Sequence, residues 1–537
     1  MFCEGETPVT FTRTLFPQLP VRVQSPVRGR RDVCSVLVTM AALLLTSNAA
    51  VAQNSTDIFA AIEDSVTNVV EKAERSIVAI ARIPLSPEPL DRQPARLPFG
   101  LHPDLQLNNP LAPGFVPQNP GTGILMTSPD NPRLRLILTN YHVVRGGQPF
   151  RNDGIIRSES RIAVRFSRTQ AAWATIYAAD PRSDMAVLAF DPSDIESAPA
   201  DIPVIRLADE SPVRKGQFVI SLGNPYAIAR DGSPSVSVGM ISNVSRFPFI
   251  ETTPDRETIH HFGTLLHVDT RLGPGASGGA LLNRDGHLVG ITTSLAALEG
   301  YETSVGYAIP LTSSIRRIVE DLLRGYEVEY GFLGVVPGES REVKATFGSV
   351  TRETRGVAIA TVVDGSPAFR AGLRANDVVL AVNSVPIFEP SDILREVGLL
   401  APGETSRLRI IRANGRESIV SVPLAKWPRR HVDQIISSND RYAPWRGLKI
   451  DWPTSRTRHF DFDRPYPRAV VVDRVEPGSP AAIAGLSEGD LLAEAHGKDV
   501  ETPQEFLKAV ANASGPVQVR LIEGSREPLI RTINPGR

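Results

Sequence analysis

The sequence predicts a mainly β fold, in which a β-barrel or β-sandwich region precedes two copies of a smaller β module. Among its 537 residues the chain has 41 glycines and 45 prolines, a composition that favours turn-rich β structure over long helices. Between residues 121 and 309, short runs of β-forming residues alternate with turn clusters. An internal repeat follows, in which matched positions such as Gly365 and Gly478 lie 113 residues apart, and a repeat this long indicates duplicated domains.

The composition indicates a globular protein and offers no sign of a nucleic-acid partner. Apolar residues make up 42% of the chain, and the formal net charge is −1. Both cysteines, Cys3 and Cys34, lie near the N-terminus, so the rest of the chain can form no disulfide and has no thiol nucleophile.

Residues 1–52 are interpreted as a signal peptide. Arginines within residues 28–31 precede the apolar run 33–45, and Ala50-Val51-Ala52 supplies a small-x-small cleavage site. The alternative is a membrane anchor, but the run is shorter than the ~20 apolar residues that a spanning helix needs. We therefore expect an exported, periplasmic protein, with secretion or membrane tethering as the other possibilities.

Three segments precede the β-rich region. Residues 53–75 have the apolar spacing of an amphipathic helix, and Ser76–Ile83 has the pattern of a strand. Residues 84–120 carry recurrent prolines, which exclude both helix and strand ladders, so this segment is expected to be a long loop. It can be a passive tether, or its apolar residues can dock on a partner subunit.

A helix is expected to begin at Thr312-Ser313, after the β-rich region, and to end at Gly325.

A serine among glycines, Gly275-Ala276-Ser277-Gly278-Gly279, is a candidate nucleophile loop, although such sequences are usually only turns. A serine hydroxyl needs a base, and the base needs an orienting carboxylate. His142 follows the end of one predicted strand, and Asp184 precedes another. Asp180 and Asp201 compete for the role of the carboxylate, and only the combination in the order His, Asp, Ser favours catalysis.

At this point the chain resembles the HtrA (Deg) family of exported serine proteases, within the chymotrypsin-like class. The resemblance runs from about Ile77 to the C-terminus. It is carried by the following segments, in order: Leu138–Val144, Asp180–Leu188, Leu222–Tyr226, Gly273–Leu282 and Val305–Pro310. Any one of these segments is a weak signal, whereas five in order are specific.

The resemblance implies a role for each site residue. His142 is expected to be the general base, Asp184 the carboxylate that orients it, and Ser277 the nucleophile. The backbone amides of Gly275 and Ser277, with Ala276 as a further candidate, are expected to form the oxyanion hole. The specificity pocket is expected to be small, to suit aliphatic side chains, and to be lined by Leu272, Ile291, Thr292 and Thr293.

Two departures from the family lie in the nucleophile loop. The family usually has Asn where this chain has Gly273 and Ala276. Neither position belongs to the triad, so the departures bear on when the oxyanion hole is formed. Residues 246–263 correspond in position to the family's long activation loop. No metal motif is found, and hydrolysis of this kind needs no cofactor, so we expect neither a metal nor a cofactor.

Both repeats resemble PDZ domains of the permuted bacterial kind, which bind peptide C-termini by strand addition. Phe332-Leu333-Gly334-Val335 is expected to be the carboxylate-binding loop of the first copy, and Gly447–Ile450 is matched to it in the second. The glycine position of that match holds Lys449, which puts peptide binding by the second copy in question. The remaining possibility for both copies is a purely structural role.

The expected architecture is a chymotrypsin-like double β-barrel followed by two PDZ domains. The expected boundaries are 1–52 for the signal peptide, 53–75 for the helical segment, 76–325 for the protease domain, 327–427 for the first PDZ domain, 428–440 for the linker and 441–537 for the second PDZ domain. The expected function is ATP-independent endoproteolysis of misfolded or unfolded proteins in the cell envelope, by a homotrimer or larger assembly. The alternatives are a holding chaperone with a latent protease and a signalling protease with one dedicated substrate.

Overall fold

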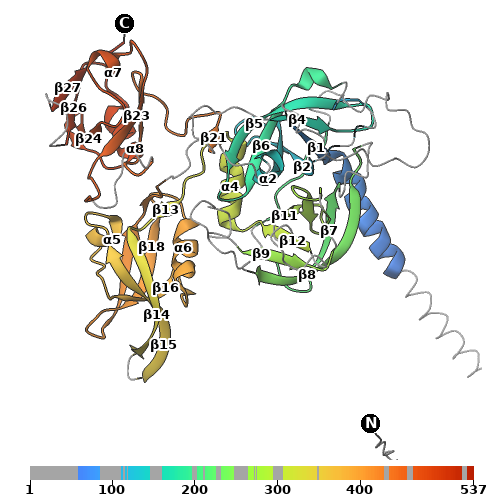
Figure 1. Cartoon of the computed structure of the whole chain (residues 1–537), viewed down its shortest axis with the longest axis horizontal. Helices are drawn as coiled ribbons and strands as arrows, with labels where there is room; N and C mark the ends of the chain where they lie inside the picture. The colour runs from blue at the N-terminus through green and yellow to red at the C-terminus, as the bar shows by residue number, and fades with distance from the viewer. Residues whose placement is uncertain are drawn as a thin grey trace, which may run out of the picture. The chain divides into compact units, whose positions relative to one another are not determined.

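A computed structural model describes most of the chain (Figure 1). The described residues are 58–84, 110–112, 115, 117, 119–145, 160–195, 202–209, 212–224, 232–246, 264–270, 272–273, 275–293, 306–347, 350–428, 435–455, 464–522 and 529–536. The expected signal peptide, most of the proline-rich segment and residues 247–263 lie outside them. The chain divides into two compact units, Met1–Asp64 and Ser65–Arg537.

An N-terminal helix covers residues 58–73. In the first unit it exposes the apolar side chains of Ile58, Phe59 and Ile62. In the second unit Val69 and Ala73 are buried in a core that includes residues of the β-rich region. A single 3-10 turn, η1 (Glu74–Ser76), joins this helix to the first strand. The amphipathic helix expected from the sequence is therefore present.

Six strands form the first barrel (Figure 1). They are β1 (Ile77–Pro84), β2 (Asn119–Thr127), β3 (Arg135–Asn140), β4 (Ser160–Arg165), β5 (Ala171–Asp180) and β6 (Met185–Phe190). The strand order β5-β4-β1-β2-β3-β6 closes because β6 also pairs with β5. The short helix α2 (Tyr141–Arg145) follows β3, and the 3-10 turn η2 (Pro192–Asp194) follows β6. Inward-facing aliphatic residues such as Val78, Ile80, Ile137 and Val164 fill this barrel.

Six further strands close the second barrel in the order β10-β11-β12-β9-β8-β7. They are β7 (Phe218–Gly223), β8 (Ser235–Arg246), β9 (Leu265–Val268), β10 (Ala280–Leu282), β11 (Leu288–Thr293) and β12 (Gly306–Pro310). Together the two barrels confirm the prediction of a mainly β, double-barrel fold.

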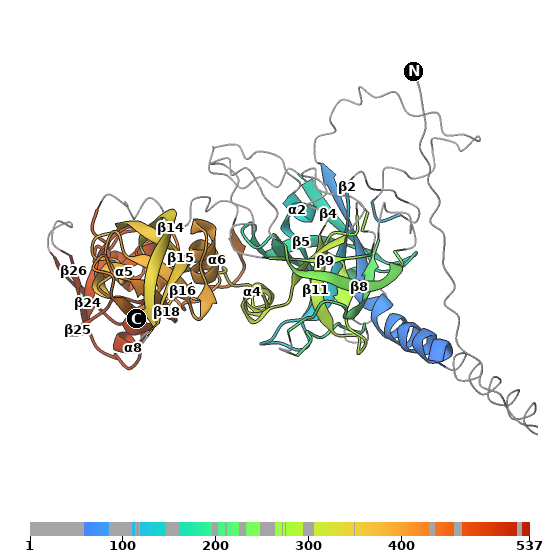
Figure 2. The ribbon, with the colours of Figure 1, turned by 90° about the horizontal axis from the view of Figure 1, so that it is seen from below.

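The helix α4 (Ser313–Leu323) packs beside the first barrel, against β3, β5 and β6 (Figures 1 and 2). The side chain of Thr312 caps it by accepting a hydrogen bond from the amide of Ile315 at 3.3 Å. Gly325 follows with a φ of 78°, the left-handed conformation that ends many helices. Both ends therefore agree with the prediction. The buried face of α4 joins one core with residues of both barrels.

The two repeats share one strand order. The first has β14 (Val335–Phe347), β15 (Val350–Val362), β16 (Val378–Val382), β18 (Thr405–Ile411) and β19 (Glu417–Pro423), with β17 (Val385–Pro386) beside β16. The second has β22 (Leu448–Asp451), β23 (Val470–Val475), β24 (Leu491–Ala495), β26 (Val517–Leu521) and β27 (Ile530–Ile533), with β25 (Lys498–Asp499) beside β24. Their helices are α5 (Pro367–Arg370) and α6 (Pro390–Gly398) in the first copy, and α7 (Pro480–Ile483) and α8 (Pro503–Val510) in the second. Each copy has its own apolar core.

Two short strands, β13 (Gly331–Phe332) and β20 (Ala425–Lys426), pair where the chain enters and leaves the first repeat. Lys426 of β20 is almost fully buried, and its ammonium group contacts three carboxylates. The distances are 3.0 Å to Glu327, 3.0 Å to Glu329 and 2.8 Å to Asp451 of the second repeat. We call this set the Lys426 cluster. A buried ammonium group is tolerated only when it is paired in this way.

The segment between the repeats returns to the first barrel. Its strand β21 (Ile436–Ser437) pairs with β5 at Ala178 and Ala179. β4 pairs only with the earlier part of β5, from Ala171 to Ala174, so β21 occupies an edge that β4 does not reach. The expected linker therefore contributes a strand to the sheet of the first barrel.

Candidate active site

Strand register brings His142 beside Asp184. β3 pairs with β6 so that Asn140 is opposite Met185. His142 lies two residues after Asn140, on the first turn of α2, and Asp184 immediately precedes Met185. The ring Nδ1 of His142 is 2.8 Å from Oδ2 of Asp184 and 3.0 Å from Oδ1. The backbone amide of His142 also donates to Oδ1, at 2.9 Å.

The backbone of Asp184 is held in an unusual conformation. Its φ is 51°, in the left-handed region that carries an energetic cost for a residue other than glycine. Its carbonyl oxygen accepts hydrogen bonds from the amide of Tyr141 at 2.9 Å and the side-chain nitrogen of Asn140 at 3.1 Å. These contacts from the α2 side hold the carboxylate toward His142.

Asp184 also sets the protonation of His142. Burial lowers the pKa of His142, whereas the charge of Asp184 and the hydrogen bond to it raise that pKa, and the two contributions of Asp184 prevail. The pKa of His142 is therefore raised above its ordinary value. A ring held by a carboxylate at Nδ1 presents Nε2 as a base, which is the arrangement that a general base for a serine requires.

The nucleophile loop, Gly275–Gly279, precedes β10, and hydrogen bonds hold three of its carbonyl groups. The side chain of Thr122 donates to the Gly275 carbonyl at 2.7 Å, and its amide donates to the Ser277 carbonyl at 2.8 Å. The hydroxyl of Thr292 donates to the Ala276 carbonyl at 2.6 Å. The loop is thus bonded to β2 of the first barrel and to β11 of the second.

Thr122 also connects the nucleophile loop to the strand that precedes His142. The hydroxyl of Thr139, on β3, donates to the Thr122 carbonyl at 2.7 Å. The amide of Asn224 donates to the Thr122 hydroxyl at 2.9 Å. Thr122 was not among the site residues expected from the sequence. The only local signal is a hydroxyl residue between two glycines, Gly121 and Gly123, and that pattern does not reveal contacts with residues 153 positions away.

Gly278 is required by the close approach of β2. Its φ is 83°, and a β-carbon there would collide with the carbonyl oxygen of Thr122 and the hydroxyl of Thr139. The glycine after the serine therefore lets the nucleophile loop lie directly against the first barrel.

The oxyanion-hole expectation needs one correction. The amide of Ala276 donates to the carbonyl of Gly273 at 3.0 Å, so it is already used within the loop. Gly275 and Ser277 remain as the candidate donors.

The four expected specificity-pocket residues lie in different environments. Leu272 is half-buried at the edge of the second barrel's core, and a β-carbon on Gly306 would lie 2.9 Å from its Cδ1 atom. Thr292 uses its hydroxyl to hold the nucleophile loop, and Thr293 is buried. Ile291 packs in the core between the barrels, and its place in the pocket stays a prediction.

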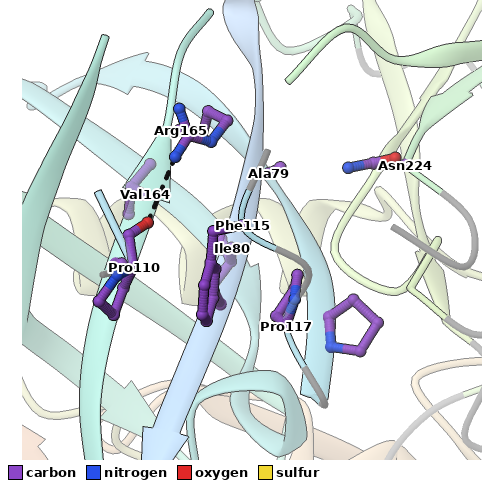
Figure 3. A pocket seen from close by; sticks show the side chains of 11 residues that line it. Ala79, Ile80, Pro110, Phe115, Pro117, Val164, Arg165 and Asn224 are labelled. Carbon is purple, nitrogen blue, oxygen red and sulfur yellow. Dashed lines mark hydrogen bonds between the residues drawn. The ribbon is translucent and has the colours of Figure 1, made fainter. Parts of the chain in front are cut away.

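Part of the proline-rich segment packs on its own barrel. The buried guanidinium group of Arg165 donates to the carbonyl of Pro110 at 3.3 Å (Figure 3). It also donates to the carbonyl of Ala112 at 2.7 Å. Phe115 and Pro117 line a cavity of about 30 Å³ there, with Asn224 at its side. That volume accommodates one or two waters, so the cavity is a packing feature and has no room for a substrate side chain.

In the first repeat the expected carboxylate-binding loop leaves backbone donors available. Leu333 is buried in the core of the repeat, and Gly334 has a φ of 84° with its backbone against Ser366. The amides of Leu333 and Gly334 have no acceptor within the described part of the chain.

The structure corrects the corresponding loop of the second repeat. Gly447 is the equivalent of Gly334. It has a φ of 77°, lies against Ser479 as Gly334 lies against Ser366, and accepts a hydrogen bond from the amide of Glu476 at 2.8 Å. The equivalent loop is therefore Trp445–Leu448, and the match made from the sequence was two residues too late.

In this second loop the first and last residues bond to each other. The amide of Leu448 donates to the carbonyl of Trp445, and the amide of Trp445 donates to the carbonyl of Leu448, both at 2.9 Å. Arg446 replaces the apolar Leu333, and its side chain binds three carbonyl groups of the same repeat.

The described residues contain no cluster of three or more His, Cys, Asp or Glu side chains arranged to hold a metal ion. Within the same residues, no helix has the length and apolar character needed to cross a bilayer.

Comparisons with known proteins agree with these domain types. Family models match as a trypsin-like peptidase domain over residues 121–291, and as PDZ domains over residues 333–424 and 471–522.

A relative from Brucella suis biovar 1, named "Probable periplasmic serine endoprotease DegP-like", is 28% identical over 378 residues. The match covers 70% of this chain and 66% of that relative, just under two thirds of its length. A relative of the same name from Pseudomonas fluorescens is 26% identical over 478 residues, which cover 86% of this chain and 92% of the relative. A solved structure described as "HtrA-type protease AlgW with decapeptide" is 22% identical, with a TM-score of 0.44, covering 68% of this chain and 99% of that one.

Proposed function

We propose that this chain, which belongs to the HtrA/Deg family of trypsin-like serine proteases with PDZ domains, is an endopeptidase whose triad is His142, Asp184 and Ser277. The observation that carries the proposal is the pair of His142 and Asp184, whose carboxylate is hydrogen-bonded to both the ring and the backbone amide of His142. Hydrogen bonds through Thr139 and Thr122 connect the strand before His142 to the loop that holds Ser277. This arrangement supports a mechanism in which a nucleophile, a base and an orienting carboxylate act together.

In the proposed acylation step, Oγ of Ser277 attacks the carbonyl carbon of the scissile peptide bond. Nε2 of His142 takes the hydroxyl proton, and the carboxylate of Asp184 stabilises the resulting imidazolium. The amides of Gly275 and Ser277 donate hydrogen bonds to the oxyanion of the tetrahedral intermediate. When the carbon–nitrogen bond breaks, His142 returns the proton to the leaving amine.

In deacylation a water molecule replaces the departed amine. His142 removes a proton from the water, the resulting hydroxyl attacks the acyl ester, and Oγ of Ser277 leaves with that proton. These steps use side chains and backbone amides of this chain only. The half-buried Leu272 and the short side chain of Thr293 support a preference for small aliphatic residues before the cleaved bond.

The proposed substrates are misfolded or unfolded proteins of the cell envelope. Such proteins expose aliphatic segments and free C-termini, which suit a small apolar pocket and a PDZ loop. Relatives named as periplasmic serine endoproteases support this proposal, and so does the signal peptide expected from the sequence. We further propose that the first PDZ domain binds substrate C-termini, because the amides of Leu333 and Gly334 are available to a carboxylate.

A homo-oligomer, with a trimer as its basic unit, is proposed from the family resemblance. Exposed apolar side chains on β7 and β8 of the second barrel support self-association, since soluble monomers rarely expose such patches. They are Phe218, Val236, Val238 and Met240.

The decisive experiment is cleavage of casein by the exported form of the chain beside its Ser277→Ala variant. We expect cleavage by the native sequence, and a loss of about 10⁶-fold in kcat for the variant, as in other serine proteases that lose the nucleophile. Equal cleavage by both would refute the triad.

The same assay separates the two alternatives. If both proteins fail to cleave casein but still suppress aggregation of a denatured protein, a holding chaperone becomes the better description. Peptide profiling against a denatured proteome tests for a dedicated signalling protease, since cleavage at a single narrow site in one protein would contradict general degradation.

A further inference from the structure

The turn that carries Asp184 is enclosed by segments flanking the first PDZ domain. This turn, residues 180–184, joins β5 to β6 and is buried except at Pro181, which is half-buried. Buried positions of a catalytic loop that contact another domain are candidates for positioning residues, because their contacts fix the loop from outside the active site.

Tyr330, immediately before β13, makes the central contact. Its hydroxyl donates a short hydrogen bond to Oδ2 of Asp180. The same oxygen accepts the amide of Ser183, at 2.9 Å. One oxygen atom of Asp180 therefore accepts hydrogen bonds from the hydroxyl of Tyr330 and from the amide of Ser183, the residue that precedes Asp184.

Arg182 ties the same turn to the end of the first PDZ domain. Its guanidinium group donates to the carbonyl of Pro428 at 3.0 Å. It also lies over the rings of Tyr330, at 5.5 Å, and Trp427, at 5.7 Å. The side chains of Tyr330 and Arg182 line a cavity of only about 10 Å³, so the turn has little room to shift.

The strand leading into the turn is held from the same side. Besides the pairing of β21 with β5, the hydroxyl of Ser438 donates to the carbonyl of Tyr177 at 2.6 Å. The side chain of Asn439 donates to the Tyr177 hydroxyl at 2.9 Å. Contacts from the entry, the exit and the following linker of the first PDZ domain thus surround residues 177–184.

We propose that Tyr330 is a positioning residue for Asp184, acting through Asp180, so that the catalytic pair is complete only when the start of the first PDZ domain is seated on the protease. This inference rests on the proposed function, because it assigns Asp184 to the triad. The hydrogen bond between Tyr330 and Asp180 matters because the backbone of Asp184 is held in the left-handed conformation. A residue held at a φ of 51° relaxes when its supports are removed, and Tyr330 supports the turn at the end opposite to Tyr141 and Asn140.

The test compares three variants of the full chain with the native sequence. Tyr330→Phe removes only the hydroxyl. Asp180→Asn keeps an oxygen that can accept from both Tyr330 and Ser183, so it serves as the conservative variant. Tyr442→Phe is the matched control, because its buried hydroxyl donates to Glu329 at 2.9 Å in the neighbouring Lys426 cluster and does not contact the turn.

Two readouts distinguish positioning from stability. The first is the rate constant for reaction of Ser277 with a fluorophosphonate, in which the serine oxygen binds phosphorus and fluoride leaves. The second is the separate measurement of kcat and KM on a short peptide. A partly unfolded variant would show fewer reactive molecules with an unchanged rate constant, whereas a misplaced Asp184 slows every molecule.

We expect Tyr330→Phe to lower both the fluorophosphonate rate constant and kcat by about 10- to 100-fold, with KM unchanged. Tyr442→Phe should keep native values, and Asp180→Asn, which keeps the acceptor oxygen, should lose less than Tyr330→Phe. The inference is overturned if Tyr330→Phe reacts at the native rate, if only its reactive fraction falls, or if Tyr442→Phe loses as much. If the native protein itself is not labelled at Ser277, it is the proposed function that fails.

Discussion

The carboxylate of Asp184 binds both the ring and the backbone of His142. One oxygen receives the amide at 2.9 Å, and the ring Nδ1 lies 2.8 Å from the other. The carboxylate therefore fixes the position of the residue as well as the tautomer of its ring. A single substitution at Asp184 should then disturb both the position of His142 and the tautomer of its ring.

Asp184→Asn should lower kcat by about 10⁴-fold, as the equivalent change does in another serine protease of this class, because the amide favours the wrong imidazole tautomer. The measurement is kcat on a short peptide, with unfolding followed in parallel. A variant that stays folded and keeps native kcat would contradict the assignment of Asp184.

The activity of the native protein should rise with pH as His142 loses its proton. Because Asp184 raises the pKa of His142, the midpoint of this rise should lie above the ordinary value of about 6.5. In Asp184→Asn the residual activity should have its midpoint at lower pH, since burial then acts alone. The check is the pH dependence of kcat/KM, and a midpoint that does not move would disprove the coupling.

The raised pKa of His142 also predicts the pH dependence of stability. The protonated ring is favoured in the folded state, so its contribution is fully present below the ordinary pKa and is lost as pH rises through the raised one. The free energy of unfolding of Ser277→Ala, measured across this range, should therefore fall more with pH than that of the double variant Ser277→Ala, Asp184→Asn.

Thr122→Val should reduce activity while leaving the shape of the side chain nearly unchanged. The Gly275 carbonyl and the Asn224 amide would both lose their partner, at a cost of about 1–3 kcal/mol for each buried group left unpaired. Denaturant unfolding and kcat measure the two effects. Thr122→Ser, which restores the hydroxyl, is the control, and equal loss in both variants would show that the methyl group matters instead.

Lys426→Met should destabilise the chain by about 3–5 kcal/mol, because it removes the ammonium group that contacts Glu327, Glu329 and Asp451, and of these Glu329 keeps Arg441 at 3.6 Å. Arg520→Met is the comparison, since Arg520 pairs with Glu494 at the surface and the pair is worth at most about 1 kcal/mol. Unfolding in urea measures the stability of both variants. Similar losses of unfolding free energy would mean that the Lys426 cluster stabilises the chain no more than a surface ion pair does.

Gly334→Ala should abolish binding of a C-terminal peptide without affecting cleavage of a short peptide. A β-carbon there would collide with Ser366 and is disfavoured at a φ of 84°. Binding of a fluorescent peptide to the Ser277→Ala protein measures the effect, with the same peptide amidated at its C-terminus as the control. Retained binding, or equal binding of the amidated peptide, would place the site elsewhere.

Local patterns in the sequence were sufficient for much of this protein. The mainly β class, the duplicated modules and both ends of α4 follow from strand patterns, a repeat of 113 residues and the signals at Thr312 and Gly325, whereas the double barrel was implied by the family resemblance. His142 and Asp184 could be proposed because each lies at a strand end and follows the order of a known family.

Contacts between distant residues could not be obtained in the same way. Asp180 competed with Asp184 for the role of the carboxylate, and its bond to Tyr330 spans 150 positions with no periodic signal. By contrast, the equivalence of Gly447 and Gly334 follows from the 113-residue offset of the repeat, and the match at Gly447–Ile450 did not apply that offset.

The pairing of β21 with β5 has a consequence for shortened forms of this protein. A chain ending before Ile436 would leave the edge of β5 at Ala178 and Ala179 bare, with backbone groups ready to pair with any extended segment. The strand between the two PDZ domains thus shields the protease from intermolecular sheet growth. Truncated forms that retain the triad should therefore aggregate more readily than the full chain.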